Sequence, residues 1–164
     1  MYRLSQETPD DLYEVEYLYD LAFAPGRTAL SSYRLRAGAP IGELSLVARD
    51  DLDIVAGAIR YWPVVIGDTG HSALLLGPVA VHPTRQGEGL GRLLIIQSLE
   101  LAIKAGWSRV ILIGDAPYYE RLGFSKAEGL EFPPPTNPER VLVKPLTDGA
   151  FEGVTGAVHS ITND

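Results

Sequence analysis

The chain has 164 residues, of which 46% are hydrophobic and 21% charged, a composition typical of a folded domain rather than a disordered segment. It contains no cysteine, which excludes disulfides and cysteine-bound zinc, and it has no long apolar run and no basic-then-apolar leader, so we expect a cytoplasmic protein without membrane contact. The formal net charge of -7 disfavours binding to a nucleic-acid backbone.

The amino-terminal segment predicts a strand followed by an amphipathic helix. Residues 2–6 form the strand, and Thr8 begins the helix as its N-cap, with Asp11 completing a capping box. Apolar residues then recur at helical spacing as far as Phe23. The arginine-containing segment 27–37 predicts a second, short helix whose charges form a solvated basic surface.

Three strands come next, in an order that predicts an antiparallel meander. They span residues 43–49, 54–66 and 71–81, and turns rich in aspartate and glycine separate them. Pro78 is unusual within the third strand because proline cannot donate a hydrogen bond to a neighbouring strand. We therefore expect either an edge strand or a break at Gly77-Pro78.

A glycine-rich loop, residues 86–92, connects the third of these strands to a helix beginning at Leu90. Its alternate glycines Gly87, Gly89 and Gly91 let the backbone turn tightly and leave the amide groups bare. Unpaired N–H groups and the helix dipole make such a position suited to an anion such as a pyrophosphate. The spacing is neither the dinucleotide fingerprint G-x-G-x-x-G nor a phosphate loop ending in Gly-Lys-Ser/Thr.

The apolar helix from Leu90 leads to the continuously apolar strand 109–113, so both should be largely buried. A strand, a helix and a second strand in this order predict a right-handed parallel crossover, which places the glycine loop at the carboxyl end of a parallel strand pair. Pro117 then begins a short helix, and a proline-rich loop at 128–138 precedes a strand at 140–143.

Two motifs carry a family resemblance. The first motif is Val79-Ala80-Val81-x-Pro83 followed by Gln86-x-x-Gly89-x-Gly91, and it resembles the acyl-CoA loop of the GNAT superfamily of N-acyltransferases. The second motif is Tyr119-Glu120-Arg121-x-Gly123-Phe124, and it resembles the second signature of the same superfamily. The tail at 146–156 and nearly the whole chain resemble its YhbS-like branch. The resemblance implies one mixed α/β (α+β) N-acetyltransferase domain at 1–164, with a core over 2–146, a tail at 147–164 and a mostly antiparallel sheet. Helices flank that sheet, which has one splayed parallel strand pair.

The resemblance also implies ligands and residue roles. It implies that acetyl-CoA is the co-substrate, that no metal is needed and that the acceptor is a small-molecule or peptide amine. Whether the protein forms a homodimer is left undecided. The cofactor contacts are assigned to Val79, Ala80, Val81, Gln86, Gly87, Glu88, Gly89, Leu90, Gly91, Arg92 and Tyr119. The tyrosine that matches Tyr119 is the proposed general acid of the family, although Tyr118 is an alternative. Arg92 is either a cation beside the phosphates or a solvated residue, and residues 27–37 would wall the acceptor site.

The chemistry of amide formation supports these roles. A phenol with a pKa of about 10 can protonate a thiolate whose conjugate acid has a pKa of about 8.5, and the Val79 N–H is our choice for stabilising the oxyanion. The chain has no cysteine to carry an acyl intermediate, which favours direct attack of the amine on the thioester. The candidate general bases are Glu43, Asp115 and Glu120. Asp115 is also predicted to cap the short helix that follows it. An alternative function is a non-catalytic acyl-CoA-binding sensor or regulatory module.

Overall fold

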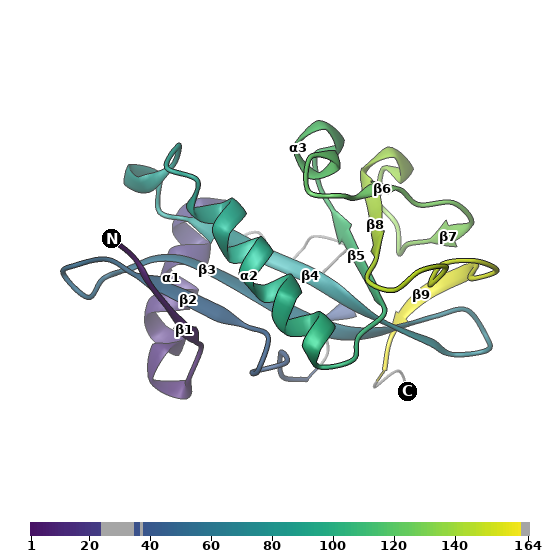
Figure 1. Cartoon of the computed structure of the whole chain (residues 1–164), viewed down its shortest axis with the longest axis horizontal. Helices are drawn as coiled ribbons and strands as arrows, with labels where there is room; N and C mark the ends of the chain where they lie inside the picture. The colour runs from purple at the N-terminus through teal and green to yellow at the C-terminus, as the bar shows by residue number, and fades with distance from the viewer. Residues whose placement is uncertain (24–34, 37, 162–164) are drawn as a thin grey trace.

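The computed structural model describes residues 1–23, 35–36 and 38–161, which fold into a mixed sheet with helices on both faces (Figure 1). In chain order the elements are β1 (Arg3–Gln6), η1 (Pro9–Asp11), α1 (Leu12–Phe23), β2 (Leu46–Arg49), β3 (Val55–Ile66), β4 (His71–Val81), η4 (Pro83–Arg85), α2 (Leu90–Lys104), β5 (Arg109–Ile113), α3 (Ala116–Glu120), β6 (Ser125–Lys126), β7 (Leu130–Glu131), η5 (Pro138–Arg140), β8 (Val141–Pro145) and β9 (Gly156–Ser160). No helix in the described ranges is long and apolar enough to span a bilayer.

The sheet confirms the predicted mixed α/β class. Its strand order is β1-β2-β3-β4-β5-β8-β6, and β9 pairs with the far end of β3 and with β7. Along the main path every neighbouring pair is antiparallel except β4 and β5, which run parallel as the crossover through α2 predicts. The short β7 adds a second parallel contact with β9. Because two-residue strands carry no sequence periodicity, neither β6 nor β7 is predicted from the sequence.

The helices α1 and α2 pack on opposite faces of the sheet (Figure 1). Val15, Leu18 and Tyr19 of α1 contact Ala58 and Ala80 on one face. On the other face, α2 buries six residues: Leu90, Leu94, Ile95, Ser98, Leu99 and Ala102. The prediction that this helix is largely buried is too broad, because Leu93 and Ile103 lie on its outer side with 38% and 51% of their surface exposed.

Several predicted boundaries shift, for local reasons. β2 starts at Leu46 instead of Glu43, since the amides of Leu44 and Ser45 both donate to the carbonyl of Ile41 and form a turn there. The predicted tail contains an additional strand, β9. The short helix predicted within 27–37 lies, except for residues 35 and 36, outside the described residues.

The capping box that begins the first helix is present. The Thr8 backbone N–H donates to the Asp11 carboxylate at 2.8 Å and its hydroxyl donates at 3.1 Å, while the Asp11 N–H donates to the Thr8 carbonyl at 2.9 Å. Arg49 of β2 also donates to Asp11 at 2.7 Å, which ties the helix start to the sheet. Burial raises the pKa of Asp11, but the hydrogen bonds from Arg49 and Thr8 outweigh it and lower the pKa below its ordinary value.

We expect Asp11→Asn to lower the free energy of unfolding by about 1–2 kcal/mol at pH 7, since it removes a charged cap and an ion pair. The folded pKa of Asp11 lies below its unfolded value, so this stabilisation is present above the unfolded pKa and is lost as the pH falls through the folded pKa. The difference between wild type and variant in urea unfolding should therefore shrink in acid. Asp10→Asn, an exposed neighbour, is the control, and an equal loss in both variants would contradict the assignment.

Candidate active site

A bulge interrupts β4 where the sequence predicts a break. Ile59 of β3 faces Val79, and Tyr61 faces Leu76, so the single residue between Ile59 and Tyr61 lies opposite Gly77-Pro78. β4 has β3 on one side and β5 on the other. The prediction of a break at Gly77-Pro78 is confirmed, and the edge-strand alternative is wrong.

After Leu75, just before the bulge, β4 has no parallel neighbour among the described strands. Pairing with β5 ends there, and the two strands diverge: β5 leads to α3, whereas β4 leads to the glycine loop before α2 (Figure 1). On the other side β4 stays paired with β3, where the His82 N–H donates to the Ala56 carbonyl at 2.8 Å. Hydrogen-bonded pairs alternate along an antiparallel ladder, so the backbone groups of Val79 and Val81 point away from β3 into the opening.

The glycine loop presents a row of unpaired amides beside this opening. Gly87 and Gly89 have φ values of 86° and 80°, in the left-handed region that favours glycine, and Gly89 is the N-cap of α2. Throughout the described part of the chain, no N–H group from 87 to 92 donates to a protein atom, and the first helical bond runs from the Leu93 N–H to Gly89 at 3.0 Å. A helix start with free donors is a ready anion-binding site.

Two residues of the loop anchor it to the sheet. The Gln86 side-chain amide lies 3.4 Å from the Val81 carbonyl, a long hydrogen bond. Leu90 is 2% exposed and packs closely on Gly57, where a Cβ atom would lie 3.0 Å from Leu90 Cδ2. The glycine in β3 therefore permits the close approach that places the start of α2 beside β4.

The charges around the loop are partly committed to one another. The Glu88 carboxylate accepts a hydrogen bond from the Tyr2 hydroxyl, and Arg85 forms an ion pair with Asp50 at 2.9 Å. Arg92 is exposed and forms no ion pair with any residue that the structure describes. Of the two arginines, Arg92 is therefore available to an incoming anion. The hydrogen bond between Tyr2 and Glu88 was not predicted from the sequence.

Two adjacent tyrosines stand in α3, on the far side of the opening. The rings of Tyr118 and Tyr119 meet edge to face, with centroids 4.9 Å apart, and Tyr119 packs against Phe124 at 5.8 Å. Tyr118 is 40% exposed, and its hydroxyl lies 3.7 Å from the position that a Cβ atom on Gly91 would occupy. Tyr119 is half-buried and packs so closely on Gly114 that a Cβ there would lie 2.5 Å from the ring.

Burial makes Tyr119 a weak acid. Burial raises the pKa of Tyr119 to about 12, and the proximity of Tyr118 and Asp115 adds to the shift while Arg140 opposes it. The Tyr119 hydroxyl thus keeps its proton across the physiological pH range. It is a weaker acid than the ordinary phenol assumed from the sequence.

The three candidate general bases lie on separate elements. Glu43 is in the turn before β2, Asp115 is the residue before α3, and Glu120 is the last residue of α3; all three are exposed. Asp115 occupies the N-cap position of α3, as predicted, and its carbonyl accepts from the Tyr119 N–H at 3.1 Å, but its side chain makes no capping hydrogen bond. Within the described ranges, no three acidic or histidine side chains gather as a metal site would require.

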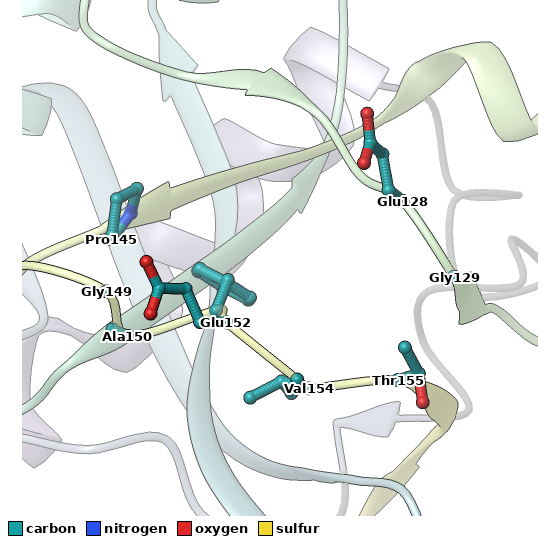
Figure 2. Close-up of a pocket in the computed structure, with 10 residues that line it drawn as sticks. Glu128, Gly129, Pro145, Gly149, Ala150, Glu152, Val154 and Thr155 are labelled. Carbon is teal, nitrogen blue, oxygen red and sulfur yellow. The ribbon is translucent and has the colours of Figure 1, made fainter.

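A separate pocket of about 580 Å³ lies between the end of β8, the segment before β7 and the loop that leads to β9 (Figure 2). It is lined by Glu128, Gly129, Pro145, Gly149, Ala150, Phe151, Glu152, Gly153, Val154 and Thr155. None of the predicted site residues is among them, so the pocket and the amide row are different places on the molecule.

The splayed parallel strand pair and the open glycine loop between β4 and α2 are the arrangement that the resemblance to N-acyltransferases implies. The family model described as Acetyltransferase (GNAT) domain matches residues 42–126, and the chain belongs to this family. It is 33% identical over 117 residues to YhbS of Escherichia coli (strain K12), described as an uncharacterized N-acetyltransferase, with 70% of each chain covered.

Solved structures agree with this assignment. The crystal structure of YhbS from Escherichia coli in complex with CoA superposes with a TM-score of 0.84 at 30% identity, covering 96% of this chain and 88% of that one. A GNAT family acetyltransferase from Brucella melitensis in complex with acetyl-CoA gives a TM-score of 0.64 at 30% identity, covering 93% and 99%. The predicted family and YhbS-like branch are confirmed.

Proposed function

We propose that this chain transfers the acetyl group of acetyl-CoA to a primary amine of a small-molecule or peptide acceptor, by direct attack in a ternary complex. The observation that carries the proposal is the row of unpaired amides at 87–92, which lies beside the outward-facing backbone of Val79 and Val81. The related YhbS and Brucella proteins, crystallised with CoA and acetyl-CoA respectively, support it.

In this proposal each part of the site holds one part of the co-substrate. The amides at 87–92 and the Arg92 guanidinium bind the diphosphate, whose charge favours both. Val79 and Val81 offer backbone donors and acceptors to the amides of the pantetheine arm, as a neighbouring strand would. The Val79 N–H then lies where it can receive the negative charge that develops on the thioester oxygen.

The transfer itself needs few protein groups. The amine nitrogen forms a bond to the carbonyl carbon, the carbon–sulfur bond breaks, the proton lost by nitrogen passes to a carboxylate or to water, and sulfur gains a proton to give CoA. We assign that second proton to Tyr119. Its transfer from a phenol of pKa about 12 to a thiolate of about 8.5 is uphill by about 5 kcal/mol. That is well below the barrier of about 16 kcal/mol for a turnover of about ten per second.

Two measurements test the proposal together. Saturating CoA should raise the melting temperature, because a ligand at 100 times its Kd stabilises the folded state by about 2.7 kcal/mol, while ATP and NAD should not. Free-thiol release from acetyl-CoA, with a panel of amines, polyamines, aminoglycosides and peptide amino termini, should then identify acceptors. Binding without turnover on any acceptor would favour the sensor function, and absence of CoA binding would contradict both.

A further inference from the structure

A buried tyrosine of α1 contacts the bulge from the face opposite α2. Tyr19 has no exposed surface, and its hydroxyl donates to the Pro78 carbonyl at 3.0 Å. The two residues are 59 positions apart in the sequence, and Pro78 is itself buried. A polar contact buried this completely on both sides is costly to leave unmade, so it fixes the position of the bulge relative to α1.

This contact acts on the group that we assign to catalysis. The Pro78 carbonyl and the Val79 N–H belong to one peptide unit, and the Pro78–Val79 bond is not one of the cis bonds of the described chain. In a planar trans peptide the carbonyl and the N–H point in opposite directions. Because the carbonyl is held toward Tyr19, the N–H must point away from α1. A hydrogen bond accepted by the carbonyl also polarises the peptide and strengthens its N–H as a donor.

A charged cluster holds Tyr19 in place. Arg60 is the β3 residue opposite the bulge; it is 7% exposed, and its guanidinium carbon lies 5.2 Å from the centre of the Tyr19 ring. It donates to both carboxylate oxygens of Glu7, at 2.9 and 2.8 Å, and to Glu16 at 2.6 Å. The bidentate geometry and the burial make this cluster rigid, since a loosened partner would leave a buried charge without compensation.

We propose that Tyr19 is a positioning residue for the transfer reaction: through the Pro78–Val79 peptide it orients and polarises the N–H that stabilises the oxyanion. The inference rests on the proposed function. Tyr19 touches neither co-substrate nor acceptor in this role. Its contribution is therefore to the transition state and not to co-substrate binding.

The test is Tyr19→Phe, which removes only the hydroxyl. Loss of a direct oxyanion donor costs about 100- to 1,000-fold in kcat, so we expect the indirect loss to be about tenfold, with the KM for acetyl-CoA unchanged within about twofold. Ile66→Val is the control: Ile66 is fully buried at the end of β3 remote from the bulge. Even if Ile66→Val lowers the melting temperature as much as Tyr19→Phe does, it should retain the kcat of the wild type. An unchanged kcat in Tyr19→Phe, or an equal loss in Ile66→Val, would overturn the proposal.

A second readout does not depend on turnover. In ¹⁵N–¹H spectra of the ligand-free protein, Tyr19→Phe should shift the Val79 amide proton upfield by more than those of Ala80 and Val81, and Ile66→Val should not. If the Val79 resonance does not move, the link between the Tyr19 hydroxyl and the Val79 N–H is refuted, whether or not the chain is an enzyme. Failure of this inference can therefore be told apart from failure of the proposed function. Should Tyr19→Phe not fold, Glu16→Gln, which weakens the hold on Arg60 from a side chain that is 41% exposed, should give the same changes at smaller size. Wild-type behaviour in that variant would count against the proposal.

Discussion

Gly91→Glu should lower the affinity for CoA at least 100-fold while the protein remains folded. A Cβ at Gly91 would meet only ordinary contacts, Val81 Cγ2 at 3.5 Å and the Tyr118 hydroxyl at 3.7 Å, so a side chain can be accommodated. Its carboxylate would then compete with the diphosphate for the free amides. Two unit charges about 4 Å apart repel by about 4 kcal/mol at an effective dielectric constant of about 20, and about 2.7 kcal/mol already corresponds to 100-fold.

Two further substitutions at the same position separate charge from size. Gly91→Gln has nearly the same volume and should weaken CoA binding by only about tenfold, and Gly91→Ala should stay close to wild type because its Cβ fits. A glutamate in the first turn interacts favourably with the helix dipole, so the melting temperature of Gly91→Glu should not fall. Titration calorimetry measures all three. Equal affinities for the Glu and Gln variants would mean that no anion is bound at this position.

Tyr119→Phe should reduce kcat about 100-fold and leave the Kd for CoA within about threefold. General acid catalysis contributes about 100- to 10,000-fold, and the Tyr119 hydroxyl makes no hydrogen bond to any described residue, so its removal leaves no partner unsatisfied. Tyr118→Phe is the matched control in the next residue. Should Tyr118→Phe carry the larger loss in kcat, the proton donor would be Tyr118, whose hydroxyl lies beside Gly91.

The pH dependence of kcat follows from the raised pKa of Tyr119. The donor is the protonated form, and a pKa of about 12 keeps that form fully populated well past the ordinary value of 10.0. Between about pH 8 and pH 10, kcat of the wild type and of Tyr119→Phe should therefore depend on pH in the same way, with no decline caused by ionisation of Tyr119. A falling limb with a midpoint near 10, absent from the variant, would show that the residue titrates as an ordinary phenol in the working enzyme.

The cofactor half of the site is readable from the sequence because its determinants are contiguous. Three alternate glycines between an apolar strand and an apolar helix specify bare amides at a helix start, and the strand–helix–strand order specifies the parallel pair. Pro78 likewise predicts a break in its strand, because proline has no N–H to donate to a neighbouring strand. Each of these inferences needs only neighbouring residues.

The parts that sequence reasoning missed depend on long-range contacts. Tyr19 reads as one more apolar position of an amphipathic helix, and Arg60 as a polar residue in a strand, until the fold brings them to the same bulge from 41 positions apart in the chain. The raised pKa of Tyr119 likewise comes from burial, which no local pattern specifies. Short strands such as β7 and β9 form because they pair with each other, and β9 with β3, and not because of their own composition.

The central claim is that the amides at 87–92 bind the diphosphate of an acyl-CoA beside the open backbone of β4. Titration of ¹⁵N-labelled protein with CoA, followed by two-dimensional NMR, tests it most directly. The account predicts saturable shifts concentrated in the amides at 87–92 and in Val79 and Val81. Shifts confined to the pocket between Glu128 and Thr155 (Figure 2), or no shifts at all, would contradict it.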